Sequence, residues 1–447
     1  MDFLTRIAER LGKWTERWVP SAFTIAVLLT ALTWVLATAW AGASPEAALK
    51  AWGGGFWELL SFSMQMALVM FTGHLLALTA PVQKLLEAVA SLAKSGRGAV
   101  VLMAVASMGL AWVNWGLSIV ASAMLVRFVA KRQPDVDYRL LVACAYFGLG
   151  ATWHAGISAS APLTVATPKH FLEAKLGIVP LADTLFSPFN LILLVAACGT
   201  LTFLAWAMHP PKERVVRIDP KLLDALQTFA APVRPAGATG FAALLDWNRG
   251  LNLAFGGVGL FYWGLNLSEA GWRSLNLNSV NFLFFMLAVA LHRSPQSLLA
   301  AGEEAAKSLS GVVLQFPLYA GIYGLFKSTG LTEKVGEAFV AASTQQTFPA
   351  LVYLYSGVVN YFVPSGGAKW AIEGPYLLDA AAKLQVAPNK VVLAYAWGDM
   401  ATDLIQPFWA LPLLGIARLE FKDILGFLLL AFAVYMPLVA IAFLIAG

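Results

Sequence analysis

The sequence is poor in charged residues and in cysteine. Only 12% of its 447 residues are Asp, Glu, Lys or Arg, whereas 59% are hydrophobic and the mean hydropathy is +0.71. A soluble globular fold of this composition would leave too much apolar surface in contact with water. The two cysteines, Cys144 and Cys198, both lie inside apolar segments, which fits reduced thiols that pack as small apolar side chains better than a secreted disulfide framework. The composition therefore predicts an all-α polytopic membrane protein.

Other absences exclude further classes. No group of His, Cys, Asp and Glu has the spacing of metal ligands, and no glycine-rich loop ends in Lys followed by Ser or Thr. Lysine and arginine are spread through the connecting segments, so the net charge of +5 gives no reason to expect a nucleic-acid partner. We expect no enzyme and no cofactor. A membrane-embedded enzyme or a channel is the alternative from another class, and a channel would need a continuous polar path.

Apolar runs near the roughly 20 residues that cross a membrane recur along the chain. Of the 30 lysines and arginines, 21 fall in segments that one topology places inside and 8 in segments that it places outside. This bias favours about nine full spans in a bacterial-type inner membrane, with the N-terminus in the cytoplasm. Residues 1–20 carry basic residues among Leu and Trp without the apolar core of a signal peptide, which predicts a cytoplasmic amphipathic helix.

Two long apolar regions contain helix-breaking polar insertions. Asn114-Trp115-Gly116 interrupts the run at 100–127, and Pro364, Gly366 and Gly367 interrupt the run at 348–378. In a membrane, irregular backbone survives only where protein or a wet cavity surrounds it. We expect both runs to form re-entrant helical hairpins.

The two insertions belong to an internal repeat. Gln65 and Asn114 have the same order and similar spacing as Gln315 and Asn360. Each repeat continues into a transmembrane helix that polar residues interrupt. The predicted organisation is a first repeat at 21–208, a cytoplasmic linker at 209–249, connecting scaffold helices at 250–307 and a second repeat at 308–447. The topology predicts that the two repeats are inverted.

Several motifs resemble the short-chain fatty acid transporter family. Pro364-Ser-Gly-Gly-Ala-Lys-Trp370 and Ile405-Gln-Pro-Phe-Trp-Ala-Leu-Pro-Leu413 carry the resemblance, and Phe56-Trp57, Asn114-Trp-Gly116 and Ile218-Asp-Pro-Lys-Leu222 extend it over nearly the whole chain. The family is similar to a larger group of elevator-type ion transporters. The resemblance implies uptake of a small carboxylate together with a cation. A butyrate-like or acetoacetate-like monocarboxylate is the expected substrate and a dicarboxylate is the alternative; we also expect contact with membrane lipid and a homodimer.

The broken regions can provide a carboxylate site, because the N-terminus of a half-helix presents free N–H groups to an anion. Residues at and beside the breaks are the candidates for binding substrate: Asn114, Trp115, Gly116, Ser118, His154, Asn360, Pro364, Ser365, Gly366, Gly367, Lys369 and Trp370. Trp409 is a further candidate for the wall of an acyl pocket. The alternative for the Asn and Ser residues is that they only cap helices or hydrogen-bond between them.

Asp399 and Asp403 are the best candidates for a coupling-cation site, since an acidic residue inside a span is costly and four residues separate two positions on one helix face. The other candidates are polar or small residues at the same breaks: Asn114, Ser158, Ser160, Asn360, Gly398 and Thr402. Oxygen-rich surroundings favour sodium, and a proton is the alternative. Four residues also separate Lys369 from Glu373, and this pair either contributes to substrate binding or only neutralises its two charges. His154 either carries a proton or hydrogen-bonds a carbonyl.

Overall fold

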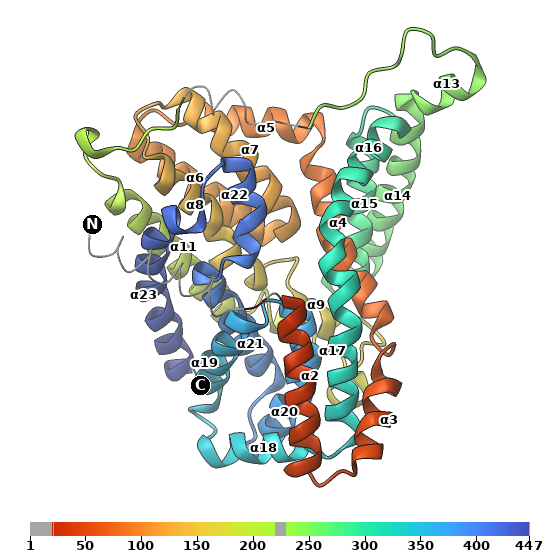
Figure 1. Ribbon diagram of the computed structural model, residues 1–447. Helices are drawn as coiled ribbons and strands as arrows, with labels where there is room; N and C mark the ends of the chain where they lie inside the picture. Colours follow the sequence, from red (N-terminus) through yellow and green to blue (C-terminus); the bar gives the residue numbers. More distant parts are fainter. Residues whose placement is uncertain (1–19, 21, 220–228, 447) are drawn as a thin grey trace.

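All regular elements that the structure describes are helices. The structure is a computed structural model, and it describes residue 20 and residues 22–219 and 229–446 (Figure 1). No strand occurs in these ranges, which confirms the all-α prediction. The predicted amphipathic helix at 1–20 lies outside the described residues except for its last position.

The helices fall into two runs on either side of the linker. Those before it are α2 Ala22–Ala39, α3 Pro45–Gly55, α4 Leu60–Ala77, α5 Ala80–Ala90, α6 Gly96–Val113, α7 Trp115–Arg132, α8 Tyr138–Ala151, η1 Trp153–Ala155, α9 Ser160–Ala166, α10 Glu173–Leu176, η2 Leu181–Asp183 and α11 Pro188–Met208. Those in and after it are η3 Lys212–Arg214, α13 Gly240–Asp246, α14 Arg249–Ala270, η4 Gly271–Ser274, α15 Leu277–Leu291, α16 Pro295–Ala306, η5 Lys307–Leu309, α17 Ser310–Ser328, α18 Leu331–Ala342, α19 Phe348–Phe362, α20 Gly366–Lys383, α21 Pro388–Ala401, η6 Thr402–Ile405, η7 Phe408–Ala410, α22 Leu411–Ala417 and α23 Phe421–Ala446.

Several helical segments have the length and apolar composition that cross a membrane. Five such stretches occur in the described residues: Leu60–Ala77, Gly96–Val113, Tyr138–Ala166, Pro188–Met208 and Phe421–Ile445. Two shorter apolar helices are Phe23–Ala39 and Leu277–Leu291. The chain is thus a multi-pass membrane protein, and the number of nine spans stays a prediction.

The order of elements recurs in the two halves of the chain. A long helix (α4 or α17) leads to a short one (α5 or α18), then to two helices that meet at a break, and then to an interrupted helix. Packing partners recur as well: α4 packs on α7 as α17 packs on α20, and α6 packs on α8 as α19 packs on α21. In Figure 1, α5 lies at the top and α18 at the bottom. The inverted relation of the two copies remains a prediction.

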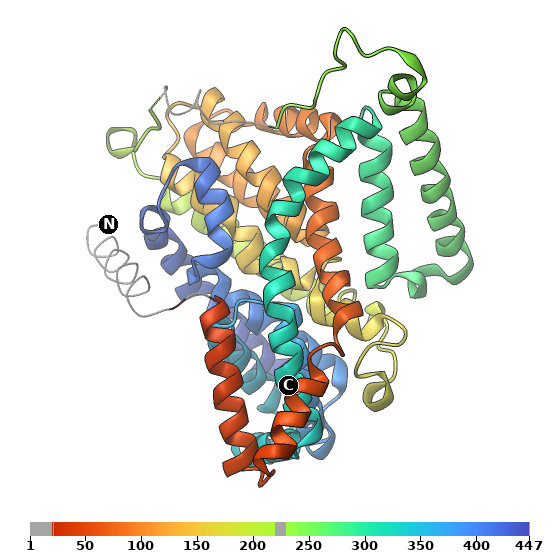
Figure 2. The ribbon, with the colours of Figure 1, turned by 45° about the vertical axis from the view of Figure 1, so that its right-hand side comes forward.

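The helices α14 and α15 stand at one side of the molecule, as the turned view in Figure 2 shows. Small residues let them approach closely: a Cβ atom on Gly256 would lie 2.7 Å from the Cβ atom of Ala290, and one on Gly259 would lie 2.4 Å from the sulfur of Met286. Helix α4 packs against α15 and thereby joins this pair to the rest of the protein.

The described start of the linker is fixed to the turn between α7 and α8. The Asp137 carboxylate accepts a hydrogen bond from the Val216 N–H at 3.1 Å, and the Tyr138 N–H donates to the Val216 carbonyl at 2.9 Å. The Arg217 guanidinium, 2.8 Å from Asp135, holds the pKa of that exposed carboxyl below its usual range. Residues 215–217 are therefore ordered against the first half of the chain.

Both predicted helix breaks are present, with different local causes. At the first, α6 ends and α7 begins at Asn114, whose extended backbone (φ −160°, ψ 121°) stops the helix. Its side chain accepts a hydrogen bond from the Leu117 N–H at 2.9 Å and so caps α7. At the second, α19 ends at Phe362, Pro364 lies in the break, and α20 begins at Gly366.

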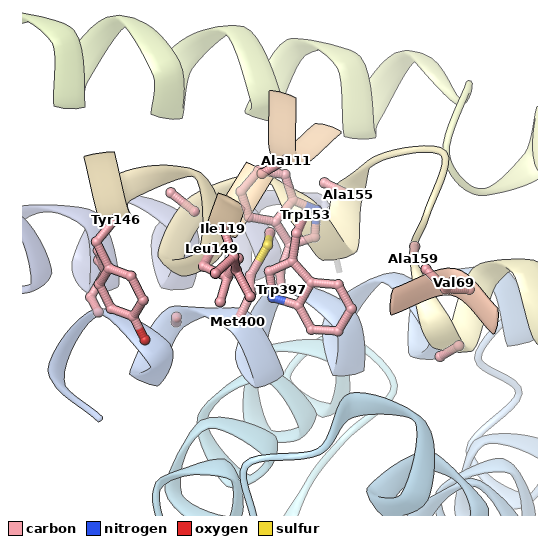
Figure 3. Packing of buried hydrophobic residues seen from close by; sticks show 14 of the residues in the cluster. Val69, Ala111, Ile119, Tyr146, Leu149, Trp153, Ala155, Ala159, Trp397 and Met400 are labelled. Carbon is pink, nitrogen blue, oxygen red and sulfur yellow. The ribbon is translucent and has the colours of Figure 1, made fainter. Parts of the chain in front are cut away.

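The two halves share one buried core. Leu149 and Trp153 of the first half lie in the same hydrophobic cluster as Trp397 and Met400 of α21 (Figure 3). Helix α21 also packs on η1 and α8. The interrupted helices of the two halves are thus in contact, and they place their polar breaks next to each other.

Candidate functional site

A cavity lies where the two interrupted helices approach the second break. It holds about 500 Å³ of space that protein atoms do not fill, part of it open to solvent. Its walls come from seven helices, three short 3₁₀ segments and the break at Ser365: Met66, Trp115, Leu149, Trp153, Ser160, Val312, Phe316, Asn360, Ser365, Gly366, Gly367, Asp403 and Trp409. Only about 50 Å³ of this space can hold the centre of a water-sized molecule, so the cavity is smaller than the roughly 300–1,000 Å³ that is usual for sites of small ligands.

Many of the residues predicted from sequence line this cavity. They are Trp115, Ser160, Asn360, Ser365, Gly366, Gly367, Asp403 and Trp409. The other candidates lie outside its lining: Asn114, Gly116, Ser118, His154, Ser158, Pro364, Lys369, Trp370, Gly398, Asp399 and Thr402. Most of the lining candidates belong to the second half of the chain.

One end of the cavity is the start of α20. Ser365 is the N-cap residue of this helix, and its side chain makes no capping hydrogen bond. Gly366 and Gly367 bring the backbone close to its neighbours: a Cβ atom on Gly366 would lie 2.5 Å from the Asp399 carboxylate, and one on Gly367 would lie 2.8 Å from the sulfur of Met66. The first N–H groups of α20 are therefore presented beside the cavity, where they suit an anion.

Asp403 is the carboxylate that faces the cavity. Its side chain is nearly buried (2% exposed) and accepts hydrogen bonds from Asn360 Nδ2 at 2.8 Å and from the Trp153 indole N–H at 3.1 Å. Asn360 Nδ2 also donates to the Thr402 hydroxyl at 3.1 Å. Neutral donors thus hold both oxygens of Asp403, and no cationic side chain forms an ion pair with it among the described residues.

Asp399 has cationic and neutral partners instead. Its Oδ1 lies 3.2 Å from the Lys369 ammonium, and its Oδ2 lies 2.8 Å from His154 Nδ1. His154 Nε2 accepts a hydrogen bond from the Ala161 N–H at 3.2 Å, so Nδ1 carries the hydrogen and donates it to Asp399. In this arrangement the imidazole is neutral.

The neighbours Trp153 and His154 each bind one of the two aspartates. Their rings stack with centroids 4.2 Å apart, while Trp153 donates to Asp403 and His154 to Asp399. The break in the first interrupted helix is thereby joined to the end of α21. This pair of contacts fixes the two carboxylates relative to each other.

Lys369 and Glu373 form the predicted ion pair, at 3.5 Å, but they do not form it alone. The ammonium also donates to the hydroxyl of Ser356 at 2.6 Å and to its carbonyl at 3.1 Å. Both charged side chains are 1% exposed. Lys369 therefore points into the protein and away from the cavity lining.

Three tryptophans form much of the apolar wall. The Trp115 ring lies edge-to-face with those of Trp153 and Trp409, with centroids 6.1 and 5.4 Å apart. Trp409 donates its indole N–H to the Pro364 carbonyl at 2.9 Å, which gives Pro364 a role in holding the wall. Trp370 instead packs on Tyr395 (centroids 4.8 Å apart) behind the cavity.

The first break uses its polar atoms for structure. Besides capping α7, Asn114 donates from Nδ2 to the Val69 carbonyl at 3.3 Å. Gly116 allows close packing, because a Cβ atom there would lie 2.8 Å from the Met70 carbonyl. These contacts correspond to the capping alternative for Asn114.

The serines of the first half also bond to backbone. Ser118 donates to the Ser107 carbonyl at 3.1 Å, and the Ser158 hydroxyl accepts from the Trp115 N–H at 3.0 Å. Thr402 in the second half donates to the Gly357 carbonyl at 2.8 Å.

Gly398 was expected at a break and Asp399 and Asp403 on one face of a regular helix, and both expectations were wrong. Helix α21 runs through Gly398 to Ala401, and the irregular segment begins at Thr402. Gly398 serves packing instead, since a Cβ atom on it would lie 2.1 Å from the Tyr353 carbonyl. Asp399 is consequently on α21, whereas Asp403 lies in the irregular segment η6.

Sequence reasoning missed several cavity residues. Trp153 is the most informative of them, since it binds Asp403 directly. Its position beside His154 in a broken segment was the available signal. Met66, Leu149, Val312 and Phe316 also line the cavity, and nothing distinguishes them in sequence from other apolar residues in membrane helices.

The overall fold is that of known membrane transporters. The Alcanivorax borkumensis YdaH transporter superposes with a TM-score of 0.59 over 94% of this chain and 98% of its own, at 16% identity. Neisseria gonorrhoeae MtrF, which is described among antimetabolite efflux pumps, superposes with a TM-score of 0.56 over 99% of this chain and 97% of its own, also at 16% identity. The two superpositions show that this chain shares the fold of these membrane proteins.

Sequence similarity then gives the family. The model of the family described as "Short chain fatty acid transporter" matches residues 3–446. An Escherichia coli (strain K12) protein named "Putative short-chain fatty acid transporter" is 40% identical over 426 residues, which cover 95% of this chain and 96% of that protein. A Haemophilus influenzae (strain ATCC 51907 / DSM 11121 / KW20 / Rd) protein of the same name is 35% identical, covering 97% and 98%. The chain belongs to the short-chain fatty acid transporter family.

Proposed function

We propose that the protein is a secondary active transporter that takes up short-chain monocarboxylates, such as butyrate or acetoacetate, together with a cation. The observation that carries the proposal is the joint position of the α20 N-terminus and the buried Asp403 at one cavity. Family membership supports the substrate class.

The cavity has the two parts that a short fatty acid requires. Trp115, Trp153, Trp409 and Phe316 form an apolar wall for the acyl chain. Free N–H groups at the start of α20, with the Ser365 hydroxyl, can bind the carboxylate. A dicarboxylate would need a second anion site, and the described residues of the lining include no lysine or arginine for it.

Coupling follows from charge. The cluster of Lys369, Glu373, Asp399 and Asp403 contains one amine and three carboxyl groups, all at most 2% exposed, and His154 beside them is neutral. A buried carboxylate without a counter-charge is costly, and a substrate anion in the same cavity would add to that cost. A cation or proton on Asp403 would remove the repulsion and would link substrate entry to cation entry.

Sodium is the cation that we favour, and a proton is the alternative. Asp403, the Asn360 amide oxygen and backbone carbonyls of the break are hard oxygen donors, which fit sodium. A group of three or more His, Cys, Asp or Glu residues suited to a metal is absent from the described residues, and a monovalent ion does not require one. Sodium would only neutralise and orient charge here, without forming or breaking bonds.

An inner-membrane homodimer that works by an elevator movement completes the proposal. The recurring element order and the opposite positions of α5 and α18 support inverted repeats, with hairpins at α6–α7 and α19–α20 (Figure 1). Helices α14 and α15 at one side would belong to the static scaffold (Figure 2).

Transport by purified protein in proteoliposomes tests the function. We expect counterflow of C3 to C6 monocarboxylates, and accumulation driven by an imposed sodium gradient at fixed pH. Accumulation driven only by a pH gradient would replace sodium with a proton. Flux that no ion gradient affects would contradict secondary transport and favour a channel.

The variant Asp403→Asn tests the coupling site. Because asparagine resembles a protonated aspartate, we expect gradient-driven accumulation to be lost while exchange of substrate for substrate continues. Asp399→Asn is the matched variant four residues away, and its main expected effect is lower stability, since it leaves Lys369 without its closest carboxylate. Normal gradient-driven uptake by Asp403→Asn would refute coupling at Asp403.

A further inference from the structure

The ammonium of Lys369 lies in a closed cage of oxygen atoms. The cage consists of the Ser356 hydroxyl at 2.6 Å, the Ser356 carbonyl at 3.1 Å, Asp399 Oδ1 at 3.2 Å and Glu373 Oε2 at 3.5 Å. The face of the Tyr395 ring covers the remaining side, with its centroid 4.2 Å from Nζ. Three helices, α19, α20 and α21, contribute to it.

The atoms of the cage would suit a free cation as well as the ammonium group of a lysine side chain. It contains two carboxylates, a hydroxyl and a backbone carbonyl, which are hard oxygen donors, and it excludes water. It is also richer in negative charge than one ammonium requires: Glu373 Oε1 and Asp399 Oδ1 are buried and have no aligned hydrogen-bond donor among the described residues. A lysine that served only to neutralise Glu373 would not need the second carboxylate and both Ser356 oxygens.

The cage is separate from the substrate cavity. None of Ser356, Lys369, Glu373 and Tyr395 lines that cavity. Two contacts lead from the cage toward the cavity: Asp399, whose other oxygen is bonded to His154, and the Tyr395 hydroxyl, which donates to the carbonyl of the cavity residue Gly366 at 2.6 Å. A cation in the cage would thus hold Asp399 and the three helices in place without touching the substrate.

We propose that this cage is a binding site for a small monovalent cation, and that Lys369 occupies it permanently as a tethered cation. The ligand class is ammonium, an alkylammonium or an alkali ion. This assignment rests on the proposed function, and it leaves Asp403 as the site of the cation that exchanges during transport. One cation rather than two would then accompany each substrate molecule.

Truncation of the lysine with addition of a free amine tests the site. Lys369→Ala empties the cage, and Lys369→Met fills it with an apolar chain of similar length. The melting temperature (Tm) of each purified full-length protein is measured in choline, sodium, ammonium and methylammonium chloride at equal ionic strength. We expect a saturable upward shift of Tm by a few degrees for Lys369→Ala with ammonium or methylammonium, and no such shift for wild type or Lys369→Met.

Three results would overturn the proposal: the same lack of response in Lys369→Ala as in Lys369→Met, an equal shift in wild type, or wild-type Tm in both variants. Where Lys369→Ala does not fold, the double variant Lys369→Ala with Glu373→Gln replaces it, because it leaves one unpaired carboxylate instead of two. Its control is Lys369→Met with Glu373→Gln, and the same upward shift of Tm is expected relative to that control. The readout needs no transport. A protein that did not transport carboxylates could still show the shift in Tm. Failure of the proposed transport function and failure of the proposed cation cage are therefore distinguishable.

Discussion

The break at Asn114 and the break near Asn360 have similar sequences but different structural roles. At the first, the backbones of α6 and α7 pack along each other, whereas α19 and α20 approach less closely and are joined by long side chains, as where Lys369 reaches Ser356. Asn114 uses its amide to cap α7 and to reach the Val69 carbonyl. Asn360 lines the cavity and donates to Asp403. A polar side chain at a helix break is thus available to a ligand only where the break does not need it.

The two halves also differ in the charge that they bring to the site. All buried carboxylates of the charged cluster come from the second half, on α20, α21 and η6. The first half contributes neutral hydrogen-bond donors, Trp153 and His154. The two halves thus share an order of helices without sharing the charged groups at the site. Variants at matching positions of the two halves can separate effects on stability from effects on binding.

The largest effect is expected where the halves are most alike, at two packing glycines. A Cβ atom on Gly148 would lie 2.2 Å from the Ser107 carbonyl, and one on Gly398 would lie 2.1 Å from the Tyr353 carbonyl. Backbone atoms cannot yield as the end of a side chain can, so we expect Gly148→Ala and Gly398→Ala each to cost about 3 kcal/mol or more. Thermal unfolding in detergent measures the loss. Gly109→Ala, which meets no atom within 4 Å, is the control.

A smaller effect separates the two asparagines. Asn360 lines the cavity, and if its amide binds the substrate carboxylate, Asn360→Ala should cost about 1.5–3 kcal/mol of binding, so that apparent affinity for the substrate falls by roughly 10- to 150-fold. Asn114→Ala removes a helix cap and should lower stability by about 0.5–2 kcal/mol. Uptake kinetics and Tm of both variants give the answer. An equal loss of affinity in Asn114→Ala would instead support the ligand role that its sequence position predicts.

The sequence was sufficient to predict both breaks, because Asn114-Trp115-Gly116 in the first and Pro364 with the glycines after it in the second interrupt long apolar runs. It was insufficient to predict which break binds ligand. That depends on Trp153 reaching Asp403 and His154 reaching Asp399, across 250 and 245 residues of sequence. Helical periodicity places residues on a face, but it does not say which distant helix that face meets.

Gly398 illustrates a second limit. A glycine in an apolar helix can mark an interruption or a close approach between helices, and the two have the same local sequence. Here Gly398 packs on the Tyr353 carbonyl, and the helix ends only after Ala401. Which of the two roles Gly398 has depends on the packing of α19 on α21, and the local sequence around Gly398 does not reveal that packing.

The smallest effect in the comparison concerns two serines beside the breaks. Ser365 lines the cavity and its hydroxyl does not cap α20, whereas Ser118 is 1% exposed and donates to the Ser107 carbonyl. If the Ser365 hydroxyl binds the substrate carboxylate, Ser365→Ala should cost about 1.5 kcal/mol of binding, a drop of roughly tenfold, with an unchanged Tm. Ser118→Ala should do the reverse, lowering stability by about 0.5–1.5 kcal/mol while affinity stays constant.

Counterflow titrations and thermal unfolding of both serine variants check this prediction. Ser365→Thr retains the hydroxyl and serves as the control, because it should keep most of the affinity that alanine loses. If threonine and alanine at position 365 weaken binding equally, the shape of the cavity and not the hydroxyl matters there. Equal affinity losses in Ser118→Ala and Ser365→Ala would mean that both breaks contact the substrate, which would remove the functional difference between the two halves.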